Sequence, residues 1–157
     1  GIRLGIIAVD KSLAPDIISY RTMINHKANV VLQDAVARWM RDGAFERHLR
    51  KVTRIYQKRR QYMVETLNSF IAEGIKLDFT VPPGGMTLWV NVGENAEEIA
   101  KAARDNDIFL FAENAFHLEP KNDENKFIRL GFAGQSEDKI KQGLLRLKPL
   151  LNRKVST

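Results

Sequence analysis

Apolar side chains recur at helical spacing through the first third of the chain. Between Asp16 and Asp42 they return after four or seven residues, which places them on one side of an α-helix: Ile17, Ile24, Val31, Ala35 and Trp39. The stretch 28–31 is poor in polar residues and allows a break there. Gly43 follows, and glycine tolerates the left-handed backbone that ends many helices. The pattern therefore predicts helical structure over residues 16–42.

A second and longer amphipathic pattern covers residues 44–73, and Gly74 closes it. Its apolar stripe consists of Phe45, Leu49, Val52, Tyr56, Met63, Leu67 and Phe70, while a basic stripe of Arg47, Lys51, Arg54 and Lys58 lies on another face. A helix of about 29 residues is long for a globular protein. We therefore expect it to span or bridge parts of a larger body.

The second half of the chain mixes strand and helix patterns. Residues 75–81 alternate apolar and polar positions, PPGG at 82–85 is a turn sequence, and 86–92 is a second strand, so 75–92 predicts a β-hairpin. The remaining predicted elements are a helix at 95–105, a strand at 107–113, a polar loop at 117–126, a strand at 126–134, and a final helix that Ser136 caps and that runs to about residue 151.

The first residues, GIRLGIIAV, are apolar on both faces apart from Arg3, as in strands that are covered on both sides. Nothing precedes this predicted strand to pair with it, which indicates a segment of a larger protein. The order of elements as a whole predicts an α+β fold, in which helices pack on one face of a small, mostly antiparallel sheet.

The amino-acid composition narrows the classes of protein to which the chain can belong. The chain has 157 residues, 44% hydrophobic and 28% charged, as in soluble globular proteins. No apolar run approaches the roughly 20 residues that cross a bilayer. The absence of cysteine excludes disulfides, thiolate metal ligands and a cysteine nucleophile, and it suits a cytoplasmic protein.

The formal charge of +6 raises the possibility of a nucleic-acid adaptor. The basic cluster RHLRKVTRIYQKRR contains a single aromatic residue, Tyr56, and that residue belongs to the apolar stripe. The stacking surface expected of a single-strand binder is therefore missing. A solvated face, or a face that meets acidic groups of another domain, explains the cluster better.

The four residues IRLG occur twice, at 2–5 and at 128–131, in different surroundings, so they are not a repeat. In the second copy, alternation places Arg129 on the same strand face as Gly131 and Ala133, which leaves room around a guanidinium that suits a carboxylate. On the pattern alone, a solvent-facing strand arginine is the favoured interpretation. Arg3 interrupts an apolar strand, where a phosphate or an internal carboxylate would serve as its partner.

Other catalytic chemistries find little support. The histidines at 26, 48 and 117 lack metal-ligand spacing, although Glu113 and His117 would be one turn apart if their loop were helical. No nucleophile elbow or phosphate-binding loop is present. We therefore expect no metal site within this chain.

Several stretches together resemble the C-terminal part of fold-type I aminotransferases, which depend on pyridoxal phosphate. GIRLGIIAV resembles the strand after the cofactor lysine, PPGGMTLWV the small-domain hairpin, and KFIRLGFA the strand that carries the substrate-carboxylate arginine. GAFERHLRKVTRIYQKRRQYM is most similar to MocR-type regulators of the GntR group, and 2-aminoadipate-type aminotransferases carry a similar stretch. AENAF at 112–116 departs from the family's P-G-x-x-F pattern.

The resemblance implies a role for each arginine and a division of the chain. Arg3 matches a contact to the cofactor phosphate, and Arg129 matches the residue that pairs with the amino-acid carboxylate. Residues 1–157 would be a single C-terminal subdomain, with 1–10 as a strand of a large domain outside the chain, 11–73 as linking helices and 74–152 as a small α+β domain. The Schiff-base lysine would also lie outside, so the resemblance implies no catalytic residue within this chain. Pyridoxal phosphate is expected in the full-length parent and not on this chain alone.

The function that we expect is that of a MocR-type regulator fragment. It would sense an amino-acid or related carboxylate effector and form a homodimer. It would bind DNA only through a winged helix outside the chain, and no association with a membrane is expected. A fragment of a catalytic aminotransferase is the alternative, so the parent could be an enzyme although this chain alone would not be. A free-standing basic nucleic-acid adaptor is a third class.

Overall fold

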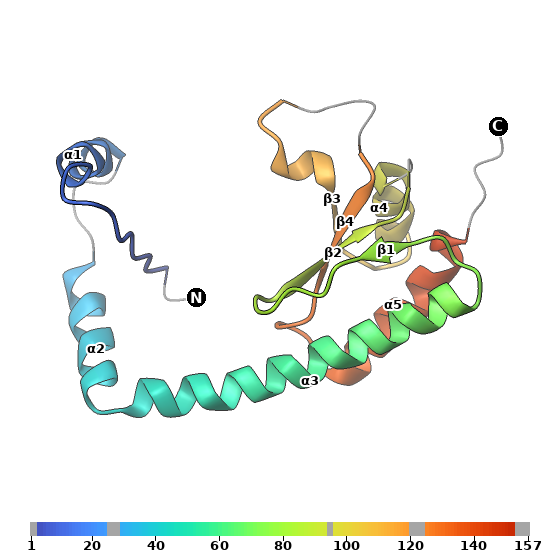
Figure 1. The fold of residues 1–157 in the computed structure, drawn as a ribbon, viewed down its shortest axis with the longest axis horizontal. Coiled ribbons are helices and arrows are strands. Elements are labelled where there is room, and N and C mark those ends of the chain that lie inside the picture. The colour runs from blue at the N-terminus through green and yellow to red at the C-terminus, as the bar shows by residue number, and fades with distance from the viewer. Residues whose placement is uncertain (1–2, 25–28, 94–95, 120–124, 153–157) are drawn as a thin grey trace. The chain divides into compact units, whose positions relative to one another are not determined.

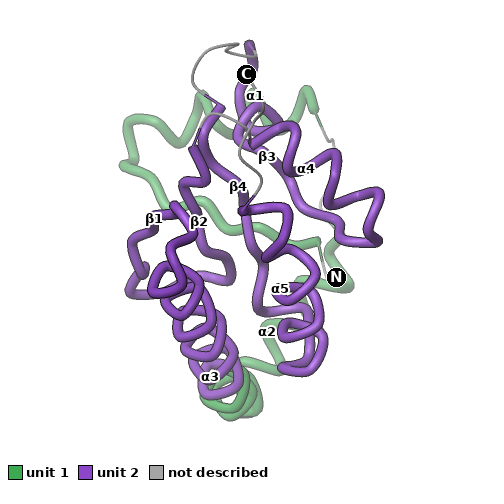
Figure 2. Tube along the Cα trace, turned by 90° about the vertical axis from the view of Figure 1, so that its right-hand side faces the viewer, with its two compact units in different colours: residues 1–52 green, residues 53–157 purple. Residues whose placement is uncertain are grey.

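The computed structural model of the protein describes residues 3–24, 29–93, 96–119 and 125–152. The chain divides into two compact units, Gly1–Val52 and Thr53–Thr157 (Figure 2). The boundary falls inside the long helix α3, which spans Ala44–Ala72.

The first unit contains helices α1 (Ala14–Ile24) and α2 (Val30–Arg41) and the beginning of α3. None of its described residues is buried. Asn29 caps α2, because its side chain accepts a hydrogen bond from the N–H of Leu32 at 3.0 Å. The predicted helical region is thus divided next to the expected break, although residues 25–28 lie outside the described part of the chain.

The strand that was predicted at residues 1–10 is not formed over residues 3–10, which are exposed and have no regular structure. A strand is stabilised by pairing with a neighbour, and no described residue pairs with this segment. Arg3 itself has a positive φ of 58°, far from strand geometry. The segment ends in a turn at Asp10, whose carboxylate accepts hydrogen bonds from Ser12; these bonds lower the pKa of Asp10 below its ordinary value.

Helix α3 follows the prediction closely at both ends. Gly43 precedes it with φ of +67°, and Gly74 follows it with φ of +93°. Near its beginning, Trp39 of α2 packs edge-on against Phe45, with ring centroids 5.1 Å apart, and lies 5.3 Å from His48. In the second unit, α3 buries Met63, Leu67 and Phe70. The apolar stripe therefore packs into a core only in the later turns of the helix.

A four-stranded antiparallel sheet forms the centre of the second unit (Figure 1). Its strands are β1 (Asp78–Phe79), β2 (Thr87–Asn91), β3 (Phe111–Ala112) and β4 (Phe127–Gly131), in the order β1-β2-β4-β3. The predicted hairpin is confirmed, since Asp78 pairs with Asn91 and Phe79 with Val90. The first and third strands are shorter than the sequence pattern predicted.

One face of this sheet is buried by helices. Leu88 and Val90 of β2 and Ile128 and Leu130 of β4 point into the core. Helices α4 (Ala96–Arg104) and α5 (Glu137–Leu151) and the end of α3 supply the opposite side of the core. The buried residues of these helices are Met63, Leu67, Phe70, Ala96, Ile99, Ala100, Ala103, Ile140, Leu144, Leu147 and Leu150. The α+β class, with helices on one face of a small antiparallel sheet, is confirmed.

Polar contacts connect α3, and the residue directly after it, to two loops and to α5 of the second unit. Arg59 donates to the carbonyl of Ala133 at 2.5 Å, and Arg60 donates to the carbonyl of Pro82 at 2.7 Å. Lys148 of α5 pairs with Glu73 at 2.5 Å, in agreement with the two helices lying side by side in both views (Figures 1 and 2). Ser136 caps α5 as expected, accepting from the N–H of Lys139. None of the helices described for residues 3–152 is long and apolar enough to span a membrane.

Candidate functional site

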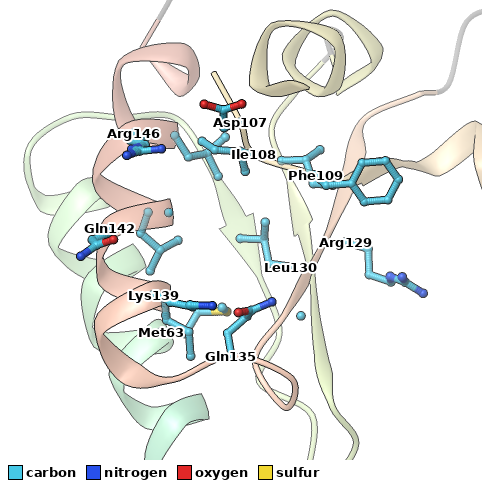
Figure 3. Close-up of a pocket in the computed structure, with 16 residues that line it drawn as sticks. Met63, Asp107, Ile108, Phe109, Arg129, Leu130, Gln135, Lys139, Gln142 and Arg146 are labelled. Atoms are coloured by element: carbon cyan, nitrogen blue, oxygen red, sulfur yellow. The ribbon is translucent and has the colours of Figure 1, made fainter. Parts of the chain in front are cut away.

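Arg129 lies in the middle of β4, on the sheet face opposite α4, α5 and the end of α3. Its neighbours Ile128 and Leu130 point into the core, so the alternation of the strand directs Arg129 to the other side. Figure 3 shows its side chain directed away from α5. The predicted face of Arg129 is therefore correct, while its role as a carboxylate ligand stays a prediction.

Two phenylalanine rings contact the Arg129 guanidinium. The Cζ atom lies 5.2 Å from the ring centroid of Phe111 and 5.0 Å from that of Phe116. Both distances are within the roughly 6 Å over which a cation is attracted to an aromatic face. Phe111 pairs directly with Arg129 across the sheet, and Phe116 comes from the 3-10 helix η1 (Glu113–Phe116). The rings restrict the guanidinium in a way that a solvent-facing arginine would not be restricted.

Trp89 extends this aromatic surface on the other side of β4. It pairs with Arg129 in the β2–β4 register, stacks on Phe127 at 5.7 Å and meets Phe116 edge-on at 5.4 Å. The strand pattern predicts open space around Arg129 and does not reveal these rings. Gly131 does leave room, because an added Cβ would meet only Thr87 Cγ2 at 4.0 Å. The site is therefore open beside Gly131 and enclosed by rings elsewhere.

The chemistry of this arrangement favours a carboxylate as the ligand of Arg129. Among the residues that the structure describes, no carboxylate oxygen lies within 4.0 Å of Arg129. Arginine keeps its charge and presents a planar edge of N–H donors that matches both oxygens of a carboxylate. Rings that pack on a guanidinium leave that edge free. Arg129 can therefore accept an acid whose remaining part lies against Trp89 or Phe116.

Glu113 holds the η1 turn in place beneath this surface. Its Oε2 atom accepts hydrogen bonds from the N–H groups of Lys126, at 3.0 Å, and Phe127, at 3.3 Å. Its Oε1 atom lies 3.5 Å from Nε2 of His117. The turn that carries Phe116 is thus connected to the start of β4. A 3-10 helix spans Glu113–Phe116, and His117 follows it in an extended conformation, so this loop is helical only up to Phe116.

Arg3 lies in the first unit and Arg129 in the second. Arg3 is exposed, and residues 4–9 offer only apolar side chains and glycine around it. A lone exposed arginine with no second side-chain donor nearby does not make a complete phosphate site. The described residues therefore do not fit pyridoxal phosphate by themselves, and the role of Arg3 stays a prediction. Those residues also contain no group of acidic or histidine side chains suited to a metal ion.

A pocket of about 480 Å³ is lined by residues of β4, Arg129 among them, by α5 and by residues 107–110 (Figure 3). Leu130 points toward α5 in this view, whereas Arg129 does not. Lys139, Gln142 and Arg146 of α5 contribute polar groups to its lining. The sequence pattern does not predict this pocket.

Comparison with known proteins decides the family. The family model for aminotransferase class I and II matches residues 1–147. The chain belongs to this family. The resemblance to the C-terminal part of such enzymes is therefore confirmed at the level of the family and the fold.

Individual relatives of the chain include both enzymes and regulators. Aromatic-amino-acid aminotransferase 1 of Thermococcus litoralis is 27% identical over 94% of this chain and 35% of its own length. The probable rhizopine catabolism regulatory protein MocR of Rhizobium meliloti is 24% identical over 94% of this chain and 29% of its own length. The crystal structure of Pyrococcus horikoshii kynurenine aminotransferase superposes with a TM-score of 0.78 at 25% identity, covering 94% of this chain and 36% of that protein. The chain thus spans about a third of the length of these relatives.

Proposed function

We propose that this chain is the C-terminal, aminotransferase-like region of a MocR-type regulator of the GntR group, and that it senses an amino acid or a related carboxylate. The observation that carries the proposal is Arg129, whose guanidinium lies against the rings of Phe111 and Phe116 with no described carboxylate partner. Sensing requires selective binding, and this arginine can supply it. The similarity to MocR supports the choice of a regulator.

The proposal assigns the remaining parts to the full-length protein. DNA binding would belong to a winged helix outside these residues, and the protein would act in the cytoplasm as a homodimer. Pyridoxal phosphate would bind in the parent, where it supplies an aldehyde that captures amines. Arg3 would then contact its phosphate, together with donors from outside the chain. This chain's own part is to hold the effector carboxylate at Arg129.

A catalytic aminotransferase of the 2-aminoadipate type is the second candidate. The similarity to the Thermococcus litoralis enzyme favours it. Arg129 would then orient a substrate carboxylate instead of an effector. The two candidates differ in the full-length gene, since a winged helix encoded ahead of the aminotransferase-like part supports the regulator. Turnover of an amino acid by a parent without that domain supports the enzyme.

Effector titration of the full-length protein tests the role of Arg129. Standard L-amino acids would be screened by calorimetry, and Arg129→Gln should weaken binding of the active one by about tenfold to a hundredfold, since a charge-assisted pair contributes on the order of 1.5–3 kcal/mol. Arg129→Lys should also bind more weakly, because an ammonium lacks the planar fork. Arg104→Gln is the matched control, because Arg104 also packs on a ring, that of Phe109 at 5.6 Å, but lies on α4.

The melting temperature of each variant would be measured alongside. Arg129 is not in the core, so Arg129→Gln should fold normally. Normal effector binding by Arg129→Gln, or equal losses in Arg129→Gln and Arg104→Gln, would show that Arg129 is not the carboxylate ligand.

A further inference from the structure

The pocket between α5 and the end of the sheet has an apolar floor and a polar rim. Its apolar lining consists of Met63, Ile108, Phe109, Leu110, Leu130, Ile140, Leu144 and Leu147. Gln135, Lys139, Gln142 and Arg146 form the rim on the side of α5, and Asp107 lies opposite (Figure 3). A volume of about 480 Å³ is in the range of pockets that bind small molecules.

The charge of the rim favours an anion. Lys139 and Arg146 are seven residues apart on α5 and therefore share one side of the helix. Among the described residues, neither has a carboxylate oxygen within 4.0 Å, although Asp107 lines the same pocket. Figure 3 shows the Lys139 side chain reaching from α5 toward Gln135. The lining thus contains one acidic residue, Asp107, and three basic ones, Lys139, Arg146 and Arg129, and none of the three has a carboxylate oxygen within 4.0 Å among the described residues.

The edge of β4 adds backbone hydrogen-bonding groups. The N–H of Phe132 donates to Met86 on the β2 side, so the N–H and C=O of the preceding residue, Gly131, point to the side of β3. Pairing with β3 ends at Arg129, and no backbone bond joins Gly131 to the described residues beyond that point. Gly131 also lines the pocket and is exposed. Its N–H is therefore available to a ligand.

Gly143 is a second and independent sign of a space kept open. It lies in the interior of α5, where glycine is less favourable than alanine. A Cβ added there would meet no atom within 4 Å, so no neighbour requires a glycine. Gly143 nevertheless lines the pocket. A larger side chain at this position would project into free space, and glycine leaves that space to a ligand.

We propose that this pocket binds a small organic anion, a carboxylate carried on an apolar or aromatic body. The carboxylate lies within reach of Lys139 and the N–H of Gly131, and the body packs on Leu130, Leu144 and Leu147. Arg129 also lines the pocket, but its side chain points away from α5, so the proposed ligand is held by Lys139 and the N–H of Gly131 and not by the Arg129 guanidinium. The proposal does not depend on whether the full-length protein is a regulator or an enzyme.

Binding of 4-phenylbutyrate to the 157-residue chain tests the proposal, with the neutral 4-phenylbutyramide as its matched probe. Amide NMR shifts should saturate at a single site that includes Lys139, Gly143 and Gly131. Replacing the carboxylate by the amide, or Lys139 by glutamine, should weaken binding about tenfold through loss of one charge-assisted contact. Lys141→Gln is the control, since Lys141 is exposed on the same helix but does not line the pocket, and its affinity should stay within about twofold.

Gly143→Leu separates occupancy of the pocket from damage to the fold. It should abolish the shifts while leaving the melting temperature equal or higher, because leucine favours helix and enters free space. Equal binding of the amide and the acid, or an affinity for Lys139→Gln equal to that of the unchanged chain, would refute the site. So would a probe that loses affinity in Arg129→Gln and keeps it in Gly143→Leu, because that probe would bind at the Arg129 guanidinium and not beside α5.

Discussion

The two units of the chain use similar apolar patterns with opposite results. Every buried hydrophobic residue that the structure describes lies between Met63 and Leu150, in the second unit. The first unit leaves Ile6, Ile7 and Ile24 exposed at 91%, 73% and 86%. An amphipathic helix needs a surface to cover, and the first unit's described residues do not supply one. The difference shows that pattern predicts which face is apolar, whereas burial depends on what is available to pack against it.

The largest effect that tests this contrast is the loss of a core side chain. Leu67→Ala removes a fully buried side chain and should lower the free energy of unfolding by about 2–5 kcal/mol. Ile24→Ala, in the exposed first unit, should change it by less than about 0.5 kcal/mol. Urea denaturation followed by tryptophan fluorescence and circular dichroism measures both. Similar losses for the two variants would mean that the first unit is packed in solution.

Self-association is the second effect, because exposed apolar surface favours contact between copies. We expect a dimer or larger species in sedimentation at micromolar concentration. Changing Ile6 and Ile7 together to aspartate should weaken the association by about tenfold or more, since a charge resists burial in an interface. Leu145→Asp on the second unit, at 52% exposure, is the control. A chain that stays monomeric at high concentration would contradict this prediction.

A smaller effect concerns polar groups that fix loops. Glu113→Ala leaves the N–H groups of Lys126 and Phe127 without their acceptor and should cost about 1–3 kcal/mol. Asp10→Ala removes a comparable acceptor in the exposed first unit and should leave global unfolding unchanged. Denaturation midpoints measure the pair. If Asp10→Ala proved as costly as Glu113→Ala, the turn at Asp10 would be part of a cooperative unit.

The smallest effect is that of two helix caps. Ser136→Ala removes the cap of α5 and should lower global stability by about 1 kcal/mol, because α5 packs in the core. Asn29→Ala removes the equivalent cap of α2 and should reduce only local helicity. Hydrogen exchange of individual amides distinguishes the two responses. Faster exchange in the second unit of Asn29→Ala would show that the units unfold together.

The sequence predicted the helices well because their signals are local. The bounds of α3 follow from a sustained apolar stripe between Gly43 and Gly74, both of which have positive φ. Strand lengths were overestimated because alternation does not reveal competing local hydrogen bonds. The N–H of Ile75 bonds to Phe70, and that of Ile108 bonds to Ala103, so helix ends use donors that the predicted strands would have needed. Pairing therefore begins only at Asp78 and Phe111.

The candidate site was predictable only where its sequence signal is local. Alternation alone placed Arg129 on the outer face of β4. The rings around it come from other strands and from η1, so they depend on register and on a turn that a single strand does not encode. The pocket beside Gly143 depends on how far β3 extends, which is again a property of tertiary packing.

The contacts of the adjacent arginines of α3 also indicate the order in which parts of the chain fold during synthesis. Arg60 bonds to Pro82, which follows it by 22 residues, whereas Arg59 bonds to Ala133, which follows it by 74. Because the loss of chain entropy grows with loop length, closing the longer loop costs about 1 kcal/mol more free energy than closing the shorter one. During translation, the hairpin can therefore attach to α3 before β4 has left the ribosome. The nascent chain would then present β2 as an open edge, onto which β4 pairs when it emerges.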